Sequence, residues 1–84
     1  MYQVLFQINI KKTLKKVPRA DQRKIMDAIT NLAIDPRPRW AEKLTGREGY
    51  RISVGNYRII YTIEDKKLII YIIDVDHRKD VYKS

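Results

Sequence analysis

The second half of the chain contains three segments rich in isoleucine, valine and tyrosine, separated only by short turns. They span residues 50–54, 57–63 and 68–75, and this composition is typical of β-strands. Gly55-Asn56 has the length and composition of a two-residue hairpin loop, in which the glycine supplies a positive φ. Residues 64–67 close a second hairpin. Strands joined by such short turns predict antiparallel pairing.

The first half of the chain predicts one strand followed by two helices. Residues 2–6 contain β-branched and aromatic side chains, whereas residues 9–16 change to a helical spacing of apolar positions. Pro18 interrupts this spacing, so a second helix is expected from Arg19. Its predicted buried stripe consists of Ile25, Ile29, Leu32 and Ala33. The helix is expected to end at Asp35, because a residue before proline is disfavoured in the α region.

Together these elements predict an α+β domain with the order β-α-α-β-β-β. Strands segregated from helices favour an antiparallel sheet that carries an N-terminal helical hairpin on one face. The segment at residues 68–73 is almost continuously apolar, so we expect it in the middle of the sheet. Residues 39–49 form the connector, which Trp40 and Leu44 are expected to anchor onto the core. A chain of 84 residues is expected to form a single domain over residues 1–84.

Charge and rare residue types narrow the functional classes. Eighteen basic against ten acidic side chains give a net charge of +8, which favours a polyanion or an acidic protein as partner. The chain has no cysteine and one histidine, so we expect no disulfide, no metal site and no cofactor. Residues 1–10 lack the features of a signal peptide and no apolar run is long enough for a membrane span, so we expect a cytoplasmic location.

Strand alternation places basic side chains on one face of the predicted sheet. Because neighbouring residues of a strand point to opposite faces, we expect Arg51, Ser53 and Arg58 on the face away from the helices. Each guanidinium offers a planar fork of donors suited to a phosphate. The segment after the last strand adds His77, Arg78, Lys79 and Tyr82. If this segment folds along the rim of the sheet, it meets the strand arginines in one hollow.

Such a hollow has the groups needed to cleave RNA without a metal ion. The ribose 2′-hydroxyl must lose a proton, the phosphorane charge must be stabilised, and the departing 5′-oxygen must gain a proton. Histidine titrates near neutral pH, arginine stabilises charge, and tyrosine can transfer a proton or stack on a base. The predicted catalytic residues are Arg51, Arg58, His77, Arg78 and Tyr82. The alternative for the two strand arginines is an ordinary solvated position on an exposed sheet face.

The sequence resembles the RelE/ParE superfamily of toxins from type II toxin–antitoxin systems over nearly its whole length. The most specific motifs are GYRISVGNYRIIYTI at residues 49–63 and VDHRKDVY at residues 75–82, supported by LKKVP at 14–18, DPRP at 35–38 and KLTG at 43–46. RelE-type members are endoribonucleases that cut mRNA in the ribosomal A site, and a cognate antitoxin wraps them and blocks that surface. The resemblance therefore implies a RelE-like fold and a ribosome-dependent mRNA interferase that inhibits translation and arrests growth.

The same resemblance implies roles for individual residues. Arg51 stands where the family often has a basic residue on a strand, and Arg58 is the arginine of the recurrent YR pair. The basic pair and terminal tyrosine of the family's tail motif correspond to His77, Arg78 and Tyr82. Ser53 departs from the pattern, because the best-known RelE members carry a lysine there. A mechanism that depends on that lysine cannot operate unchanged in this chain.

A wider set of polar residues is expected to contact RNA or the ribosome, namely Lys11, Lys12, Lys15, Lys16, Ser53 and Lys79. The four helix lysines are most simply the solvent side of a helix, although their charge also favours approach to ribosomal RNA. Two other functions stay open. One is a ParE-like toxin that inhibits DNA gyrase and is not a nuclease. The other is a purely RNA-binding member of the superfamily, suggested by the missing lysine at Ser53.

Overall fold

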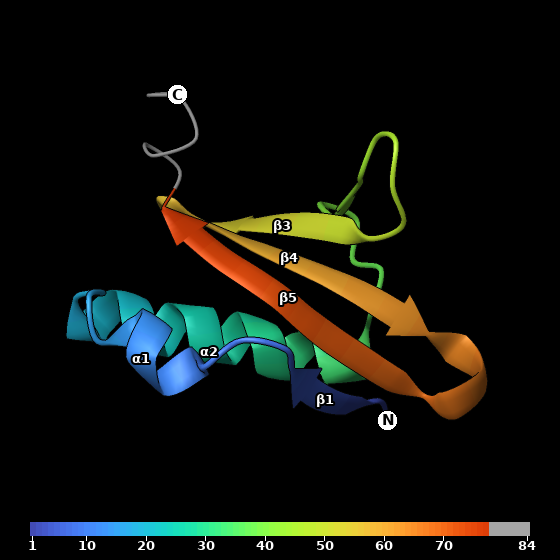
Figure 1. Ribbon diagram of the computed structural model, residues 1–84, viewed down its shortest axis with the longest axis horizontal. Coiled ribbons are helices and arrows are strands. Elements are labelled where there is room, and N and C mark those ends of the chain that lie inside the picture. The colour runs from blue at the N-terminus through green and yellow to red at the C-terminus, as the bar shows by residue number, and fades with distance from the viewer. Residues whose placement is uncertain (78–84) are drawn as a thin grey trace.

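The computed structural model describes residues 1–77, which form a five-stranded sheet with two helices on one face (Figure 1). The elements are β1 (Gln3–Phe6), α1 (Ile10–Leu14), α2 (Arg19–Ile34), β2 (Glu42–Lys43), β3 (Tyr50–Val54), β4 (Tyr57–Glu64), the 3₁₀ turn η1 (Asp65–Lys67) and β5 (Ile69–His77). The predicted α+β class is confirmed, and so is the order of the predicted elements along the chain. The short strand β2 was not predicted.

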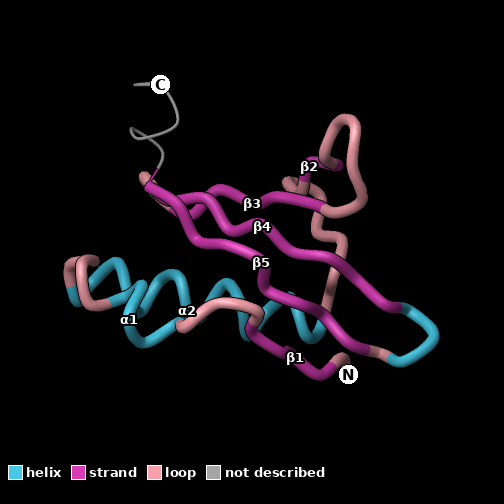
Figure 2. The backbone as a smooth tube through the Cα atoms, in the orientation of Figure 1, coloured by secondary structure: helices cyan, strands magenta, loops and turns pink. Residues whose placement is uncertain are grey.

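The sheet has the strand order β1-β5-β4-β3-β2. β3, β4 and β5 pair antiparallel as predicted, and the additional strand β2 pairs antiparallel with β3. The prediction of an antiparallel sheet is wrong for β1, which pairs with β5 in parallel. β1 lies at the edge of the sheet, and its own residue pattern does not encode its direction. β5 lies between β1 and β4, which confirms the interior position predicted from its apolar run. β2 lies inside the predicted connector (Figure 2), where Glu42 and Lys43 pair with β3.

The core forms between α2 and one face of the sheet. α2 buries the stripe that its periodicity predicts: Ile25, Ile29, Leu32 and Ala33. Of these, Ile25, Ile29 and Leu32 form one core cluster with residues of the sheet, namely Ile52, Ile59, Tyr61, Ile70 and Ile72. α1 is shorter than predicted; it starts after Asn9, whose side chain accepts a hydrogen bond from the Lys12 amide at 3.1 Å, and it ends at Leu14. Neither of these helices is long and apolar enough to cross a membrane.

The connector is anchored differently from the prediction. Trp40 is 66% exposed, so its predicted packing onto the core is wrong; the nearby Pro38 is buried instead. Leu44 is half-buried, and its Cδ1 lies 3.1 Å from the place that a Cβ on Gly49 would occupy. Gly49 has a φ of +128°, and the same Cβ would come within 3.0 Å of the Tyr61 carbonyl. Glycine therefore allows the connector to approach the sheet closely at this point.

A polar cluster joins the N-terminus, the segment that follows α2, the start of β3 and the β4–β5 turn. The Arg37 guanidinium donates two hydrogen bonds to the Asp65 carboxylate, at 2.8 and 3.2 Å, and a third to the Tyr50 hydroxyl at 3.1 Å. The Tyr2 hydroxyl donates to the same carboxylate at 2.6 Å. These hydrogen bonds, from Arg37 first and then from Tyr2, lower the pKa of Asp65 to about 2. The cluster is an acid-sensitive link between segments far apart in the chain.

We expect the Asp65 link to weaken in acid. Because the pKa of Asp65 is lower in the folded state than its unfolded value, its contribution is fully present above about pH 5 and is lost as the pH falls toward 2. The expected result is a decline in Tm across that window that is shallower in Asp65→Asn. Thermal melts followed by circular dichroism at pH 5, 4, 3 and 2 measure it. Parallel curves for the two proteins would contradict the assignment.

Candidate functional site

One face of the sheet is left uncovered by α1 and α2 (Figure 1) and is called the open face. Its members on β3, β4 and β5 alternate with buried residues and are paired across the strands: Arg51, Ser53, Arg58, Ile60, Thr62, Tyr71, Asp74 and Asp76. The structure thus places Arg51, Ser53 and Arg58 away from the helices, as alternation with Ile52 and Ile59 predicts.

The two strand arginines occupy diagonal positions on neighbouring strands. Arg51 of β3 lies opposite Ile60 of β4, and Arg58 lies two residues earlier on β4, opposite Ser53. Diagonal neighbours in a sheet are within reach of long side chains, so both guanidiniums can contact one ligand. Across β5, Arg58 lies opposite Asp76. The Arg51 side chain is 37% exposed, and its Nη2 lies 3.2 Å from the Glu42 carboxylate.

Acidic side chains share the open face with these arginines. Glu42 pairs with Arg51 across β2 and β3, and Asp74 and Asp76 lie opposite Ile60 and Arg58 on β5. The sequence prediction missed these three carboxylates on this face. The connector was not expected to add the strand that carries Glu42, and Asp74 and Asp76 follow a bulge in β5 that the sequence does not show. Within the described residues, this part of the face therefore balances positive charge with negative charge and does not form a uniformly basic surface.

Removal of the Glu42 charge is expected to strengthen binding of RNA to the open face. An exposed ion pair of this kind contributes roughly 0.2–1 kcal/mol. Glu42→Gln should therefore lower the Kd for single-stranded RNA by about two- to threefold, because the Glu42 carboxylate then no longer competes for the donors of Arg51. Fluorescence anisotropy at low salt measures the change, with Glu48→Gln, an exposed carboxylate in the neighbouring loop, as the matched control. Equal effects of both substitutions would contradict a local role for Glu42.

A β-bulge near the end of β5 changes the direction of His77. Tyr61 pairs with Ile72, but the preceding Ile60 pairs with Asp74, so Ile73 is the extra residue of the bulge. The Asp74 carboxylate accepts a hydrogen bond from the Val75 amide at 2.9 Å, immediately after the bulge. Beyond this point the alternation is reversed, and Val75 is buried against the helices. His77 is the next residue on that side.

His77 therefore lies on the helix-covered face, opposite to the arginines. It pairs with Tyr57, and the two rings meet edge to face with centroids 4.9 Å apart. The predicted hollow that joins His77 to Arg51 and Arg58 is wrong for the described residues, because the bulge re-aims the imidazole. Three other residues of the predicted site lie outside the described residues, namely Arg78, Lys79 and Tyr82.

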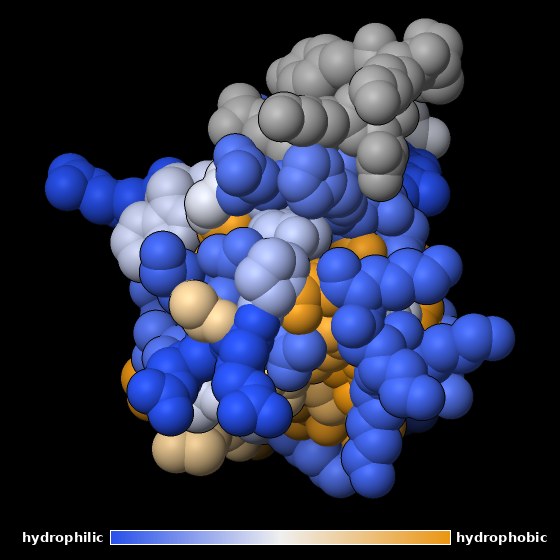
Figure 3. Space-filling model, turned by 90° about the vertical axis from the view of Figure 1, so that its left-hand side faces the viewer, coloured by the Kyte–Doolittle hydropathy of each residue, from blue (hydrophilic) through white to orange (hydrophobic). Residues whose placement is uncertain are grey.

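A pocket of about 490 Å³ opens beside His77 and is called the end pocket. Its lining residues come from α1 and the turn after it and from the ends of β4 and β5: Lys12, Thr13, Lys16, Val17, Tyr57, Val75, Asp76 and His77. Figure 3 faces this end of the molecule, where hydrophilic side chains cover most of the surface and a strip of hydrophobic atoms shows between them. Lysine and histidine side chains together make the end pocket a candidate anion site.

All four predicted helix lysines are exposed, namely Lys11, Lys12, Lys15 and Lys16. Lys12 and Lys16 are among the residues that line the end pocket, whereas Lys11 and Lys15 are not. The four lysines therefore divide into two pairs with the same spacing but different surroundings. The sequence predicted their exposure but not this division, which follows from how α1 sits against the end of β5.

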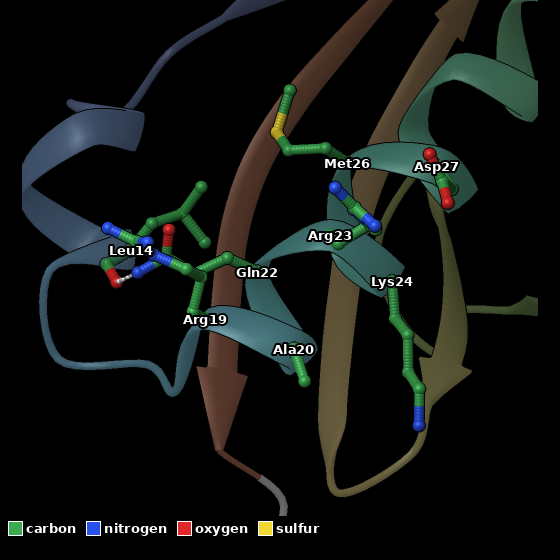
Figure 4. Close-up of a pocket in the computed structure, with 8 residues that line it drawn as sticks. All are labelled: Leu14, Arg19, Ala20, Gln22, Arg23, Lys24, Met26 and Asp27. Atoms are coloured by element: carbon green, nitrogen blue, oxygen red, sulfur yellow. Dashed lines mark hydrogen bonds between the residues drawn. The ribbon is translucent and has the colours of Figure 1, made fainter.

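A second, larger hollow of about 730 Å³ lies along the helices (Figure 4). Arg19, Arg23 and Lys24 contribute to its lining together with Leu14 and Met26. Also in this hollow, the Gln22 side-chain amide donates to the carbonyls of Leu14 and Val17, at 2.7 and 2.9 Å. The two bonds provide donors for backbone carbonyls at the end of α1 and in the turn after it, which have no partner within the helix. They fix the turn between α1 and α2, and so the position of Lys16 at the end pocket.

Comparison with known proteins identifies the family. No curated protein matches the sequence. A family model described as the ParE toxin of the type II toxin–antitoxin system parDE matches residues 4–82. The chain belongs to this family. It is therefore a toxin of a type II toxin–antitoxin system, within the RelE/ParE superfamily.

Solved structures similar to this ParE-family toxin are RelE proteins. RelE in the RelE–RelB complex of Pyrococcus horikoshii is 28% identical, with 92% of this chain and 94% of that chain covered and a TM-score of 0.77. The RelBE2 complex of Mycobacterium tuberculosis gives 26% identity, coverage of 92% and 98%, and a TM-score of 0.78. The RelB–RelE complex of Methanococcus jannaschii gives 30%, 94% and 95%, and 0.72. These likenesses confirm the RelE-like fold.

Proposed function

We propose that this toxin is a ribosome-dependent endoribonuclease that cuts mRNA in the A site. The observation that carries the proposal is the diagonal placement of Arg51 and Arg58 on an uncovered sheet face, in a chain similar in structure to RelE toxins. Two guanidiniums so placed suit one phosphodiester, because each presents a fork of donors to phosphate oxygens. Action on the ribosome implies a cytoplasmic location.

The proposed reaction needs no metal ion. The ribose 2′-hydroxyl loses its proton and attacks the adjacent phosphorus, the bond to the 5′-oxygen breaks, and that oxygen gains a proton. The products are a 2′,3′-cyclic phosphate and a 5′-hydroxyl end. We assign Arg58 and Arg51 to the phosphorane charge, and Arg78 and Tyr82 to completion of the site from the tail, with Tyr82 as the group able to transfer a proton. His77 faces away from Arg58, so we do not assign it to proton transfer on the open face.

We also propose a cognate antitoxin as the protein partner. Several structurally similar toxins were crystallised with RelB antitoxins. The net charge of +8 favours an acidic partner segment. An antitoxin that covers the open face would exclude mRNA from Arg51 and Arg58 and so inhibit the toxin.

The second candidate is inhibition of DNA gyrase, which is favoured by the description of the matching family model as a ParE toxin. One pair of assays separates the two functions. Antitoxin-free toxin is added to ribosomes programmed with a defined codon in the A site, and separately to gyrase with relaxed plasmid. The proposal expects cleavage within the A-site codon and normal supercoiling. Intact mRNA together with blocked supercoiling would overturn it in favour of the ParE-like function.

A further inference from the structure

We infer that the end pocket binds a phosphate group of single-stranded RNA, on the side of the sheet opposite to Arg51 and Arg58. This inference uses the proposed function only to identify the strand as RNA. It concerns binding and involves no chemical step. It gives His77, Lys12 and Lys16 a common role that alternation alone did not predict, because the bulge in β5 brings them together.

The charges at the end pocket favour an anion. Lys12 and Lys16 are four residues apart in and after α1, so they project from the same side of the helical turn, and both are exposed. His77 faces the same pocket and lies edge to face with the Tyr57 ring. The one acidic residue among the described lining residues is Asp76. In the register of β4 and β5 it lies opposite Arg58, and both belong to the open face. The described open face has no comparable excess of basic groups.

The apolar part of the lining argues against a peptide as the occupant. Val17, Val75 and Tyr57 are each only 7–8% exposed, so a hydrophobic anchor residue of a partner would find little free apolar surface. The ammonium groups of Lys12 and Lys16 are exposed, and such donors suit phosphate oxygens. A volume of about 490 Å³ lies within the usual range for small-ligand pockets, so a nucleotide unit can enter.

The position of the end pocket favours a strand over an isolated phosphate ion. Tyr57 directly precedes Arg58 on β4, and His77 directly follows Asp76, the residue opposite Arg58. The pocket and the arginine therefore lie at the same end of the β4–β5 pair, on its two faces. A flexible single strand held by Arg58 can continue around this end of the sheet and place another phosphate between Lys12 and Lys16.

The chain supplies a matched pair of variants for the test. Lys12→Ala/Lys16→Ala removes the two lysines of the end pocket, and Lys11→Ala/Lys15→Ala removes two exposed lysines with the same spacing that do not line it. Both variants lose the same charge from the same helical segment. Circular dichroism establishes that both retain the fold. The probe is a fluorescein-labelled single-stranded RNA with 2′-O-methyl riboses, which cannot be cut by 2′-hydroxyl attack.

Each phosphate contact with a single strand adds about 0.7 to the slope of log Kd against log salt. We expect Lys12→Ala/Lys16→Ala to weaken binding by about tenfold and to lower the slope by about 0.7, because the two lysines hold one phosphate. The Lys11→Ala/Lys15→Ala variant should lose no more than about threefold, with a slope change below about 0.5. Equal losses in the two variants would overturn the inference, because they would indicate general attraction to the basic surface.

His77 supplies an independent readout, because it is the single histidine of the chain and gives one set of imidazole signals in NMR spectra. The uncleavable RNA should shift these signals in the wild type and much less in Lys12→Ala/Lys16→Ala. Inorganic phosphate at the same concentration should have little effect on these signals. An equal shift with phosphate would indicate that the pocket binds a free anion and not an RNA strand, and it would overturn the inference. A toxin that passes these tests but leaves ribosomal mRNA intact would contradict the proposed function and leave the pocket assignment standing.

Discussion

Replacement of Arg58 by alanine is expected to slow cleavage of ribosome-bound mRNA by about 10²–10³-fold, which is the usual cost of removing one well-placed group that stabilises transition-state charge. Arg58 lies on the open face near the start of the central strand β4, between Ser53 and Asp76. Arg58 is on the face of the sheet opposite to α2 and is not one of the buried core residues, so the fold should persist. The loss should appear in the rate of single-turnover cleavage.

Two further variants make the Arg58 prediction specific. Arg58→Lys keeps the charge but loses the planar fork, so its rate should lie between those of wild type and Arg58→Ala. Arg47→Ala removes an exposed arginine from the β2–β3 loop and should stay within about threefold of wild type. If Arg58→Ala cuts as fast as Arg47→Ala, Arg58 has no role in the reaction.

The largest expected effect on stability comes from Ile59→Ala. Ile59 is fully buried in β4, between Ile52 and Val75 on the neighbouring strands. Truncation of a buried isoleucine to alanine typically lowers the free energy of unfolding by about 2–5 kcal/mol. For a small domain this is a large part of the total, about 5–15 kcal/mol.

Urea denaturation followed by circular dichroism measures the Ile59→Ala effect. Ile34→Ala is the matched control, because Ile34 is 67% exposed at the end of α2 and its truncation should change the free energy of unfolding by no more than about 0.5 kcal/mol. Comparable losses in the two variants would contradict the assignment of the core to the interface between α2 and β4.

The regular parts of the fold could be predicted from the sequence because their signals are local. β3 begins and ends at the predicted residues, and Gly55 has the positive φ expected of the hairpin loop. The buried stripe of α2 follows directly from its helical spacing. Trp40 was misplaced because an aromatic residue in a loop has no periodicity to show whether it is buried. The polar cluster around Arg37 joins residues up to 63 positions apart, so no local pattern marks it.

Only part of the candidate site could be predicted, because only some of its residues lie in segments with a clear local pattern. Arg51 and Arg58 lie on strands with clear alternation, so their face could be predicted. His77 follows Ile72-Ile73-Asp74-Val75, where the apolar run hides the alternation and one extra residue reverses the face of everything after it. Only the pairing of β5 with β4 reveals the bulge. The grouping of His77 with Lys12 and Lys16 depends on that reversal, so it follows from the structure alone.

Cleavage by 2′-hydroxyl attack in the ribosomal A site is tested most directly by one substitution in the RNA. Ribosomes are programmed with two mRNAs that differ in a single 2′-deoxy ribose, at the nucleotide on the 5′ side of the cleaved bond. The account predicts a 2′,3′-cyclic phosphate end from the all-ribose mRNA and no cut at that bond in the 2′-deoxy mRNA. Equal cleavage of both, or cleavage of neither by folded, antitoxin-free toxin, would contradict it.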